Sequence, residues 1–170
     1  STAVTAATED TAYTYTVTAA DVDSGDTITL TGTTVPSWAT FTAGTGVLTG
    51  TPLNANVGSN SVVITASDGT ASVTDTFTIT VANTNDAPTI SSTAVTAATE
   101  DTAYTYTVTA ADVDSGDTIT LTGTTVPSWA TSTAGTGVLT GTPLNANVGA
   151  NSVVIPASDG TASVTDTFTI

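Results

Sequence analysis

The segment Ala82-Asn83-Thr84-Asn85-Asp86-Ala87-Pro88-Thr89-Ile90 separates two copies of one module. Ser1–Ile79 recurs as Ser92–Ile170, and the copies differ only at Phe41/Ser132, Ser59/Ala150 and Thr65/Pro156. Pro88 fixes its own φ and biases Ala87 toward an extended conformation. We therefore predict two tandem domains, 1–82 and 92–170, joined by a short, stiff linker at 83–91. The second domain ends before its counterpart of Thr80-Val81, which predicts a piece cut from a longer repeat array.

All charged side chains of the chain are acidic. The 170 residues include 15 Asp and Glu, no Lys, Arg or His, and carry a formal net charge of −15. Because phosphate backbones and anionic lipids are bound by basic side chains, the composition excludes nucleic-acid binding and provides no attraction to membrane surfaces. No apolar run approaches the roughly eighteen residues of a membrane span, and no signal-like basic segment is present, so membrane insertion is not expected.

The chain also lacks the residues that brace many extracellular domains. A module of about 91 residues buries only some 60–65% of its unfolded surface, so an additional source of stability is expected. Cys is absent, which excludes disulfides and thioesters, while the lack of Lys and Gln excludes isopeptide and Thr ester crosslinks. Because carboxylates are the only charged groups and hard cations prefer oxygen ligands, we predict a divalent cation as the brace.

Apolar and polar residues alternate with a period of two along most of each copy, and no helix is indicated. Tyr13, Tyr15 and Val17, for example, alternate with threonines. The expected strands of the first copy lie around 2–7, 13–18, 27–31, 36–41, 47–49, 62–66 and 73–81, and Ser67-Asp68-Gly69 forms a hairpin turn. Seven short strands with regularly spaced turns predict an all-β protein with one antiparallel β-sandwich in each copy.

Two residues conflict with this pattern. Asp75 has the same parity as Val73, Phe77, Ile79 and Val81, so a regular strand would point a carboxylate into the core. We expect a bulge there, or a strand-edge position where backbone N–H groups bind its oxygens. Pro156 replaces Thr65 in a run expected at the centre of a sheet, so either that position faces a bulge or the second copy is slightly weaker.

The loops of a seven-strand sandwich alternate between its two ends, which sorts the acids into two groups. Glu9 and Asp10 fall at one end of the first copy. The loops after strands two and six place at the other end Asp21, Asp23, Asp26 and Asp68. Stacking the two copies end to end would gather Glu9, Asp10, Asp86, Asp112, Asp114, Asp117 and Asp159. These carboxylates would repel one another unless cations neutralised them. Ca²⁺ accepts six to eight oxygen ligands, and Asn83 and Asn85 can add carbonyl oxygens.

Several motifs resemble a known family. The runs Val35-Pro36-Ser37-Trp38-Ala39-Thr40-Phe41, Gly46-Val47-Leu48-Thr49-Gly50-Thr51-Pro52, Ala66-Ser67-Asp68-Gly69 and Phe77-Thr78-Ile79-Thr80-Val81 are similar to the dystroglycan-type cadherin-like and immunoglobulin-type repeats of bacterial surface proteins. Asn85-Asp86-Ala87-Pro88 resembles the cadherin linker, and Asp21-Val22-Asp23 its Asp-x-Asp loop. The resemblance implies an immunoglobulin-like sandwich in a secreted, calcium-stiffened adhesin. The chain lacks the Asp-Arg-Glu motif of cadherins proper, and its linker has Ala82 and Thr84 at positions where a fuller linker carries ligands.

Plainer interpretations compete with each of these features. Asp-Gly and Asp-Ser-Gly are common turn formers, although turn chemistry alone does not explain why acids are rare elsewhere. We expect Trp38 and Trp129 to pack in or beside the core, and Phe41, which becomes Ser132, to be partly exposed. Asp23-Ser24-Gly25 matches the aspartic-protease motif. Neighbouring acids crowd that motif and its partner motif is missing, so we expect no enzymatic activity.

Threonine makes up about a quarter of the chain and raises further alternatives. Outward arrays such as Thr14-Thr16-Thr18 and Thr74-Thr76-Thr78 could be O-glycosylated or match ice. Threonine is also simply a good strand former, and the twist of a sandwich disfavours a flat lattice. A carbohydrate-binding module attached to a polysaccharide-active protein is the stronger alternative, and it requires exposed aromatic side chains.

The sequence therefore predicts calcium-stiffened spacer repeats of a large extracellular bacterial adhesin or surface fibre. The expected partners are neighbouring repeats, with lateral contacts between copies in a fibre, and carbohydrate is not favoured. A spacer is duplicated freely because each unit interacts only with its neighbours, whereas a specific ligand site would usually appear in one unit.

Overall fold

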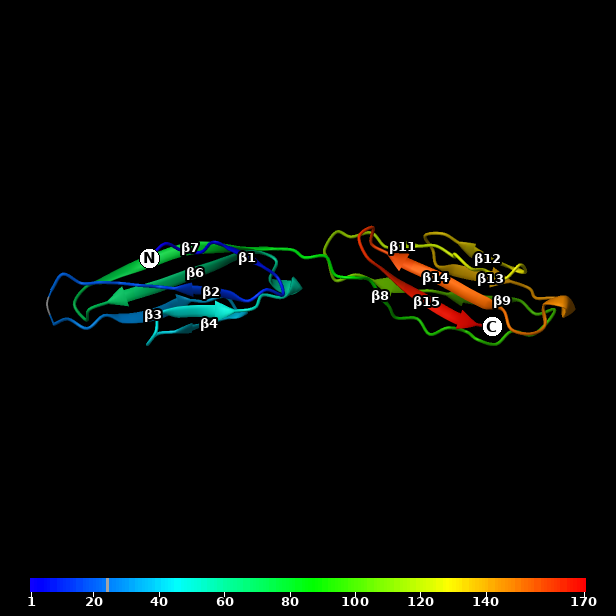
Figure 1. The fold of residues 1–170 in the computed structure, drawn as a ribbon, viewed down its shortest axis with the longest axis horizontal. Helices are drawn as coiled ribbons and strands as arrows, with labels where there is room; N and C mark the ends of the chain where they lie inside the picture. Colours follow the sequence, from blue (N-terminus) through cyan, green and yellow to red (C-terminus); the bar gives the residue numbers. More distant parts are fainter. Residues whose placement is uncertain (24) are drawn as a thin grey trace. The chain divides into compact units, whose positions relative to one another are not determined.

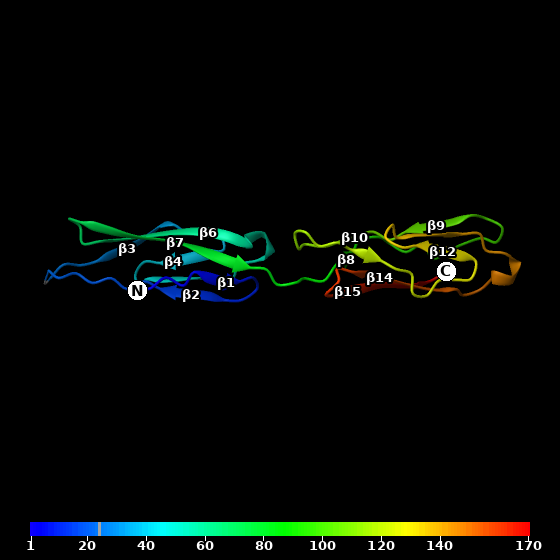
Figure 2. The same cartoon turned by 90° about the horizontal axis from the view of Figure 1, so that it is seen from above.

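The computed structural model describes residues 1–23 and 25–170 and contains two compact units, Ser1–Thr84 and Asn85–Ile170. Strands are the main regular secondary structure of each unit, as Figures 1 and 2 show from two directions. The predicted all-β class is confirmed. Each unit is described below by itself.

The first unit has seven strands in two sheets. They are β1 (Ala6–Thr8), β2 (Tyr13–Thr16), β3 (Thr29–Thr34), β4 (Ala39–Thr42), β5 (Val47–Gly50), β6 (Gly58–Ser67) and β7 (Ser72–Ala82). One sheet has the order β1-β7-β6-β3 and the other β2-β5-β4. The pairs are antiparallel except that β1 runs parallel to β7, with Ala7 opposite Val81. The parallel pair places the start of the module beside its end.

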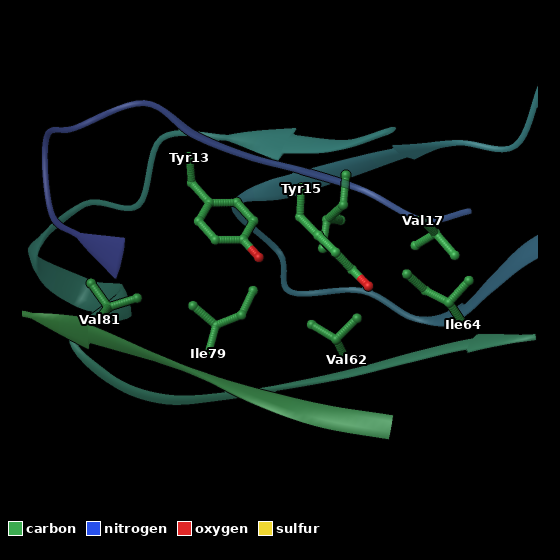
Figure 3. Packing of buried hydrophobic residues seen from close by; sticks show 8 residues of the cluster. Tyr13, Tyr15, Val17, Val62, Ile64, Ile79 and Val81 are labelled. Atoms are coloured by element: carbon green, nitrogen blue, oxygen red, sulfur yellow. The ribbon is translucent and has the colours of Figure 1, made fainter. Parts of the chain in front are cut away.

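The core of the first unit lies between the two sheets, where the period of two puts every second side chain. Tyr13, Tyr15 and Val17 point from β2 and the residues after it toward Val62, Ile64, Ile79 and Val81 of the opposite sheet (Figure 3). Leu48, Val62 and Ile79 are completely buried. Burial of each such side chain stabilises the fold by about 1.5–3 kcal/mol. The alternation of apolar and polar residues thus determines both sheets of the sandwich.

The second unit repeats this arrangement with a different set of short strands. They are β8 (Thr89–Ile90), β9 (Tyr104–Thr107), β10 (Ala110–Ala111), β11 (Thr120–Leu121), β12 (Ala130–Thr133), β13 (Val138–Gly141), β14 (Ser152–Ser158) and β15 (Ser163–Thr169). The sheets have the orders β11-β14-β15 and β12-β13-β9, and β8 pairs with β10. One three-residue 3-10 helix in each unit, Asn54–Asn56 and Asn145–Asn147, is not expected from the sequence.

Asp75 lies within a regular strand, so the predicted bulge is wrong. The register of β6 and β7 is continuous, with Asp75 opposite Ile64. The half-buried carboxylate accepts a hydrogen bond from the Tyr15 hydroxyl at 3.2 Å, not from backbone N–H groups. Val73 shares the inward parity but is 68% exposed, so the buried face of β7 begins only after it.

Pro156 removes one backbone N–H from a strand pair of the second unit. In the first unit Thr65 pairs with Thr31. In the second unit Thr122 donates its N–H to the Pro156 carbonyl at 3.2 Å, and proline has no N–H to return. β11 ends just before Thr122, whereas β14 continues through the proline in register with β15. Of the two alternatives from the sequence, the lost ladder bond favours a weaker second copy.

Candidate metal centres

The acids that the sequence assigns to one end of the first unit do lie together. Carboxylate oxygens of Asp21, Asp26 and Asp68 are within 4.8 Å of one another. Asp21 and Asp26 come from the loop between β2 and β3, and Asp68 from the hairpin between β6 and β7. Asp23 is exposed and donates its backbone N–H to Asp21 Oδ1 at 2.8 Å, outside this group of three. The Asp23-Ser24-Gly25 motif includes Ser24, which lies outside the described residues.

The hairpin acids are fixed by backbone hydrogen bonds. Asp68 Oδ1 accepts the N–H groups of Thr70 and Ala71, each at 2.6 Å. These bonds favour the ionised carboxylate and lower the pKa of Asp68. Gly69 has φ +99°, which an L side chain rarely adopts. The predicted Ser67-Asp68-Gly69 turn therefore holds a carboxylate in a defined orientation.

The second unit carries the corresponding cluster, formed by Asp112, Asp117 and Asp159, whose oxygens also lie within 4.8 Å of one another. Asp114 is 6% exposed and donates its N–H to Asp112 Oδ1 at 2.9 Å. We call Asp112, Asp114, Asp117 and Asp159 the acidic cluster of the second unit. It combines the loop after β10 with the hairpin between β14 and β15.

Two linker residues are hydrogen bonded to this acidic cluster. The Asp86 N–H donates to Asp114 Oδ2 at 2.7 Å, and Asn85 Nδ2 donates to Asp159 Oδ2 at 3.0 Å. Asn85 thus directs its amide nitrogen toward the acids, whereas the sequence analysis expects its carbonyl oxygen to act. Asn83 is exposed.

The electrostatics of the acidic cluster are unfavourable without a counter-charge. Desolvation by burial, followed by the charges of Asp114, Asp112 and Asp159, raises the pKa of Asp117. Hydrogen bonds from Ala162 and Thr161 instead lower the pKa of Asp159. Since the chain has no Lys, Arg or His, no basic side chain relieves this repulsion.

The donor set of the acidic cluster fits a hard divalent cation. Asp112 Oδ2 is buried and has no hydrogen-bond partner among the described residues. A buried carboxylate oxygen without a partner is costly, and a cation would satisfy it. Carboxylate oxygens from two loops suit Ca²⁺, which accepts several oxygens in flexible geometry. These residues can therefore hold calcium.

At the other end of the first unit, Glu9 is buried whereas its neighbour Asp10 is exposed. Glu9 is 1% exposed, and its Oε1 accepts the Thr84 N–H at 2.9 Å. Its Oε2 has no hydrogen-bond partner among the residues that the structure describes. Asp10 is exposed, with φ 57° and its N–H donated to Pro52. Sequence analysis misses this contact of Glu9 with the Thr84 N–H, because backbone groups leave no compositional signal.

The tryptophans contribute to the edge of each core, as predicted. Trp38 meets Tyr13 edge to face at 5.6 Å and donates its indole N–H to Asn60 Oδ1 at 3.0 Å. Trp129 makes the same contacts with Tyr104 and Asn151. Both indoles are half-buried, and each is held by a ring contact and a hydrogen bond within its own unit.

Within the described residues, no helix has the length and hydropathy needed to cross a membrane. No curated protein sequence matches the chain significantly. Among solved structures, an endo-fucoidan hydrolase of glycoside hydrolase family 107, MfFcnA4, is 33% identical with a TM-score of 0.44. The match covers 97% of this chain but only 27% of the hydrolase.

Cadherin domains are also similar to the chain. Protocadherin gammaB7 EC3-6 is 20% identical with a TM-score of 0.61, over 98% of this chain and 44% of that structure. Human protocadherin-24 EC1-2 is 17% identical with a TM-score of 0.54, over 97% and 89%. At these low identities, the TM-scores show a shared fold and nothing more. The family model described as "Putative Ig domain" matches residues 1–82 and again 87–170, so the chain belongs to this immunoglobulin-like family and carries two tandem copies of its domain.

Proposed function

We propose that the chain is a calcium-stiffened spacer of a large extracellular adhesin or surface fibre of bacteria, without catalytic activity. The observation that carries this proposal is the attachment of Asn85 and Asp86, the first residues of the second unit, to the acidic cluster. A cation in that cluster would hold the linker at Asn85 and Asp86. Calcium would thereby restrict how the linker bends.

Calcium would neutralise the charge of the carboxylates and bind several of their oxygens at once. Asp112 would use the oxygen that has no partner, and Asp117 would lose the repulsion that raises its pKa. Asp159 Oδ1 already receives two backbone N–H groups, which leaves Oδ2 for the linker side of the cluster. In the first unit, Asp21, Asp26 and Asp68 would form the equivalent site toward a preceding repeat.

Glu9 enters the proposal through chain connectivity. It accepts the N–H of Thr84, and Thr84 is bonded covalently to Asn85 of the second unit. A ligand from the first module, together with Asp86, Asp112 and Asp114, would couple the two repeats through one ion. Neighbouring repeats are then the main partners, and lateral contacts between copies would build a fibre.

A spacer role explains why both copies have the same acidic residues in the loops at the ends of the sandwich. Each unit needs to interact only with its neighbours, so an array can grow by duplication. The carbohydrate-binding alternative is less favoured because the contacts of Trp38 and Trp129 already engage both indoles.

Calcium titration combined with small-angle scattering tests the proposal. Calorimetry on demetallated protein should give binding tighter than about 1 mM, as in extracellular calcium modules. The maximum dimension should then be longer, and the distance distribution narrower, in calcium than in chelator. Asp112→Ala with Asp114→Ala should remove both effects, while Asp101→Asn, which removes one exposed charge elsewhere, should retain them. Scattering profiles that superimpose with and without calcium would contradict a calcium-set joint.

A further inference from the structure

The side-chain amide of Asn85 donates hydrogen bonds at the acidic cluster of the second unit. Asn85 is an exposed residue of that unit, and its Nδ2 donates to Asp159 Oδ2 at 3.0 Å and to the Asp86 carbonyl at 2.6 Å. Hydrogen bonds from Ala162 and Thr161, and then the bond from Asn85, lower the pKa of Asp159. The partly positive amide hydrogens thus stabilise a carboxylate in a chain that has no basic side chain.

The orientation of this amide is fixed by its two partners. Nitrogen and oxygen of an asparagine side chain are told apart by the hydrogen bonds that they make. Both partners of Asn85 Nδ2 are acceptors only, since one is the main-chain carbonyl of Asp86 and the other is the carboxylate of Asp159. The N–H groups of Thr161 and Ala162 at Asp159 Oδ1 favour the ionised carboxylate, which has no proton to donate. The opposite orientation would place three oxygens together without a hydrogen between them.

Asp159 also belongs to the carboxylates that can hold a cation. One of its oxygens lies within 4.8 Å of oxygens of Asp112 and Asp117. Two backbone N–H groups already bond Asp159 Oδ1, so Oδ2 has more capacity left, and Oδ2 accepts the Asn85 amide. A cation bound at Oδ2 would meet the partly positive hydrogens of this amide. The orientation of Asn85 in the structure therefore opposes cation binding.

We propose that Asn85 is a two-position switch of the calcium site. Its Nδ2 donates to Asp159 in the absence of calcium, and half a turn about its Cβ–Cγ bond presents Oδ1 instead when calcium binds. This inference rests on the proposed calcium site and describes its regulation. The half-turn exchanges nitrogen and oxygen without moving the rest of the side chain. Since Asn85 is exposed, water can replace both lost hydrogen bonds, and exposed side chains rotate within nanoseconds. The carbonyl ligand that the sequence predicts at Asn85 then belongs to the calcium-bound form.

The switch would weaken calcium binding and keep the linker attached when calcium is absent. A site whose competent orientation is populated to about one tenth has its apparent Kd raised about tenfold. Extracellular calcium modules bind at about 0.1–1 mM, where such a penalty is tolerated. Without calcium, the Asn85 amide and the Asp86 N–H, which donates to Asp114 Oδ2 at 2.7 Å, would still attach the linker to the second unit.

NMR of the side-chain amides of the intact chain tests the switch, with Asn145 as a matched internal control. Asn145 Nδ2 donates to Glu100 Oε2 at 3.0 Å, which is the same kind of bond at the same distance, outside the acidic cluster. The variants Asn85→Ala and Asn145→Ala assign the two NH₂ groups. In chelator both groups should exchange with water more slowly than a free asparagine amide. On titration with calcium chloride, the protection of the Asn85 NH₂ should be lost and its ¹³Cγ resonance should shift, whereas Asn145 should keep both values.

Three results would overturn the switch. The Asn85 NH₂ group could exchange freely in chelator, or it could stay protected at saturating calcium. It could also be released without a shift of ¹³Cγ, because Asn85 would then be displaced and not turned. If calorimetry detects no calcium binding, the spacer proposal fails, and the same titration is made with La³⁺, an oxygen-binding ion of higher charge. A half-turn of Asn85 with La³⁺ retains the switch without the spacer, and the absence of a half-turn removes both.

Discussion

A hydrogen bond inside the second sandwich gives a quantitative test of how the inward acid is tolerated. Tyr106 donates its hydroxyl to Asp166 Oδ2 at 2.6 Å, a length typical of a bond to an ionised carboxylate. Tyr106→Phe removes this bond while keeping the ring that meets Phe168 edge to face at 5.2 Å. Hydrogen bonds to charged groups contribute about 1.5–3 kcal/mol, and partial exposure of Asp166 reduces the expected loss to about 1–2 kcal/mol.

The loss should depend on the carboxylate and on the length of the bond. Asp166→Val in the Tyr106→Phe background should recover most of the stability, because the inward position then carries an apolar, β-branched residue. The coupling energy of the two substitutions should be at least about 1 kcal/mol. In the first unit Tyr15 lies 3.2 Å from Asp75, so Tyr15→Phe should cost less than Tyr106→Phe.

The two tryptophans allow each unit to be followed separately within the intact chain. Urea unfolding is monitored through the indole N–H resonances of Trp38 in the first unit and Trp129 in the second. Tyr106→Phe should lower only the urea midpoint that is reported by Trp129. The expected loss of unfolding free energy corresponds to a decrease of roughly 5–15 °C in the melting temperature of a domain of this size. A loss below about 0.5 kcal/mol, or strictly additive effects in the double variant, would refute the reasoning.

Three further measurements test the site, the cores and the carbohydrate alternative. Asp117→Asn should raise the melting temperature in chelator at pH 7 and weaken calcium binding. The wild-type repulsion at Asp117 should likewise fade as the pH falls through its raised pKa; no stabilisation in chelator would contradict the repulsion. Burial, then the neighbouring Tyr15, raises the pKa of Tyr13 to about 12, and that of Tyr104 is raised to about 12 as well. Stability from these tyrosines is complete below a pH of about 10 and should be lost as the pH rises to about 12, with native absorbance at 295 nm lagging behind unfolded controls. Soluble polysaccharides should neither quench the fluorescence of Trp38 nor retard the protein in affinity gels, and a clear shift would favour carbohydrate binding.

Local patterns in the sequence account for most of the fold. Alternation around Tyr13 and Tyr15 determines which faces are buried, and Asp68-Gly69 has the chemistry of the turn that forms there. Loops of a sandwich alternate between its ends, so Asp21 and Asp68 were predicted to meet although 46 residues lie between them in the chain, and the structure brings them together. These features follow from the alternation of apolar and polar residues, from the chemistry of the turns and from the loop arrangement of a seven-strand sandwich. All three can be inferred from a single sequence.

Features that depend on a distant partner could not be predicted in the same way. The expected bulge at Asp75 is wrong because the hydroxyl of Tyr15, on another strand, binds the carboxylate. The alternation of apolar and polar residues already accounts for the burial of Tyr15. Nothing in that pattern indicates that its hydroxyl also binds Asp75. Likewise, Pro156 loses its bond to a neighbouring strand whose register only the folded sheet defines.

The two copies are nearly identical, so comparing them does not reveal that linker residues contact both sandwiches. Glu9 is 1% exposed and accepts the N–H of Thr84, whereas Glu100 is exposed. Val164 is covered beside Ile90, whereas Val73 is open. Because the sequence around each pair is the same, these differences arise from Thr84 and Ile90 themselves. The first part of the linker completes one sandwich and its last part completes the next, so the structural repeat is longer than the copy that sequence comparison delimits at Ile79.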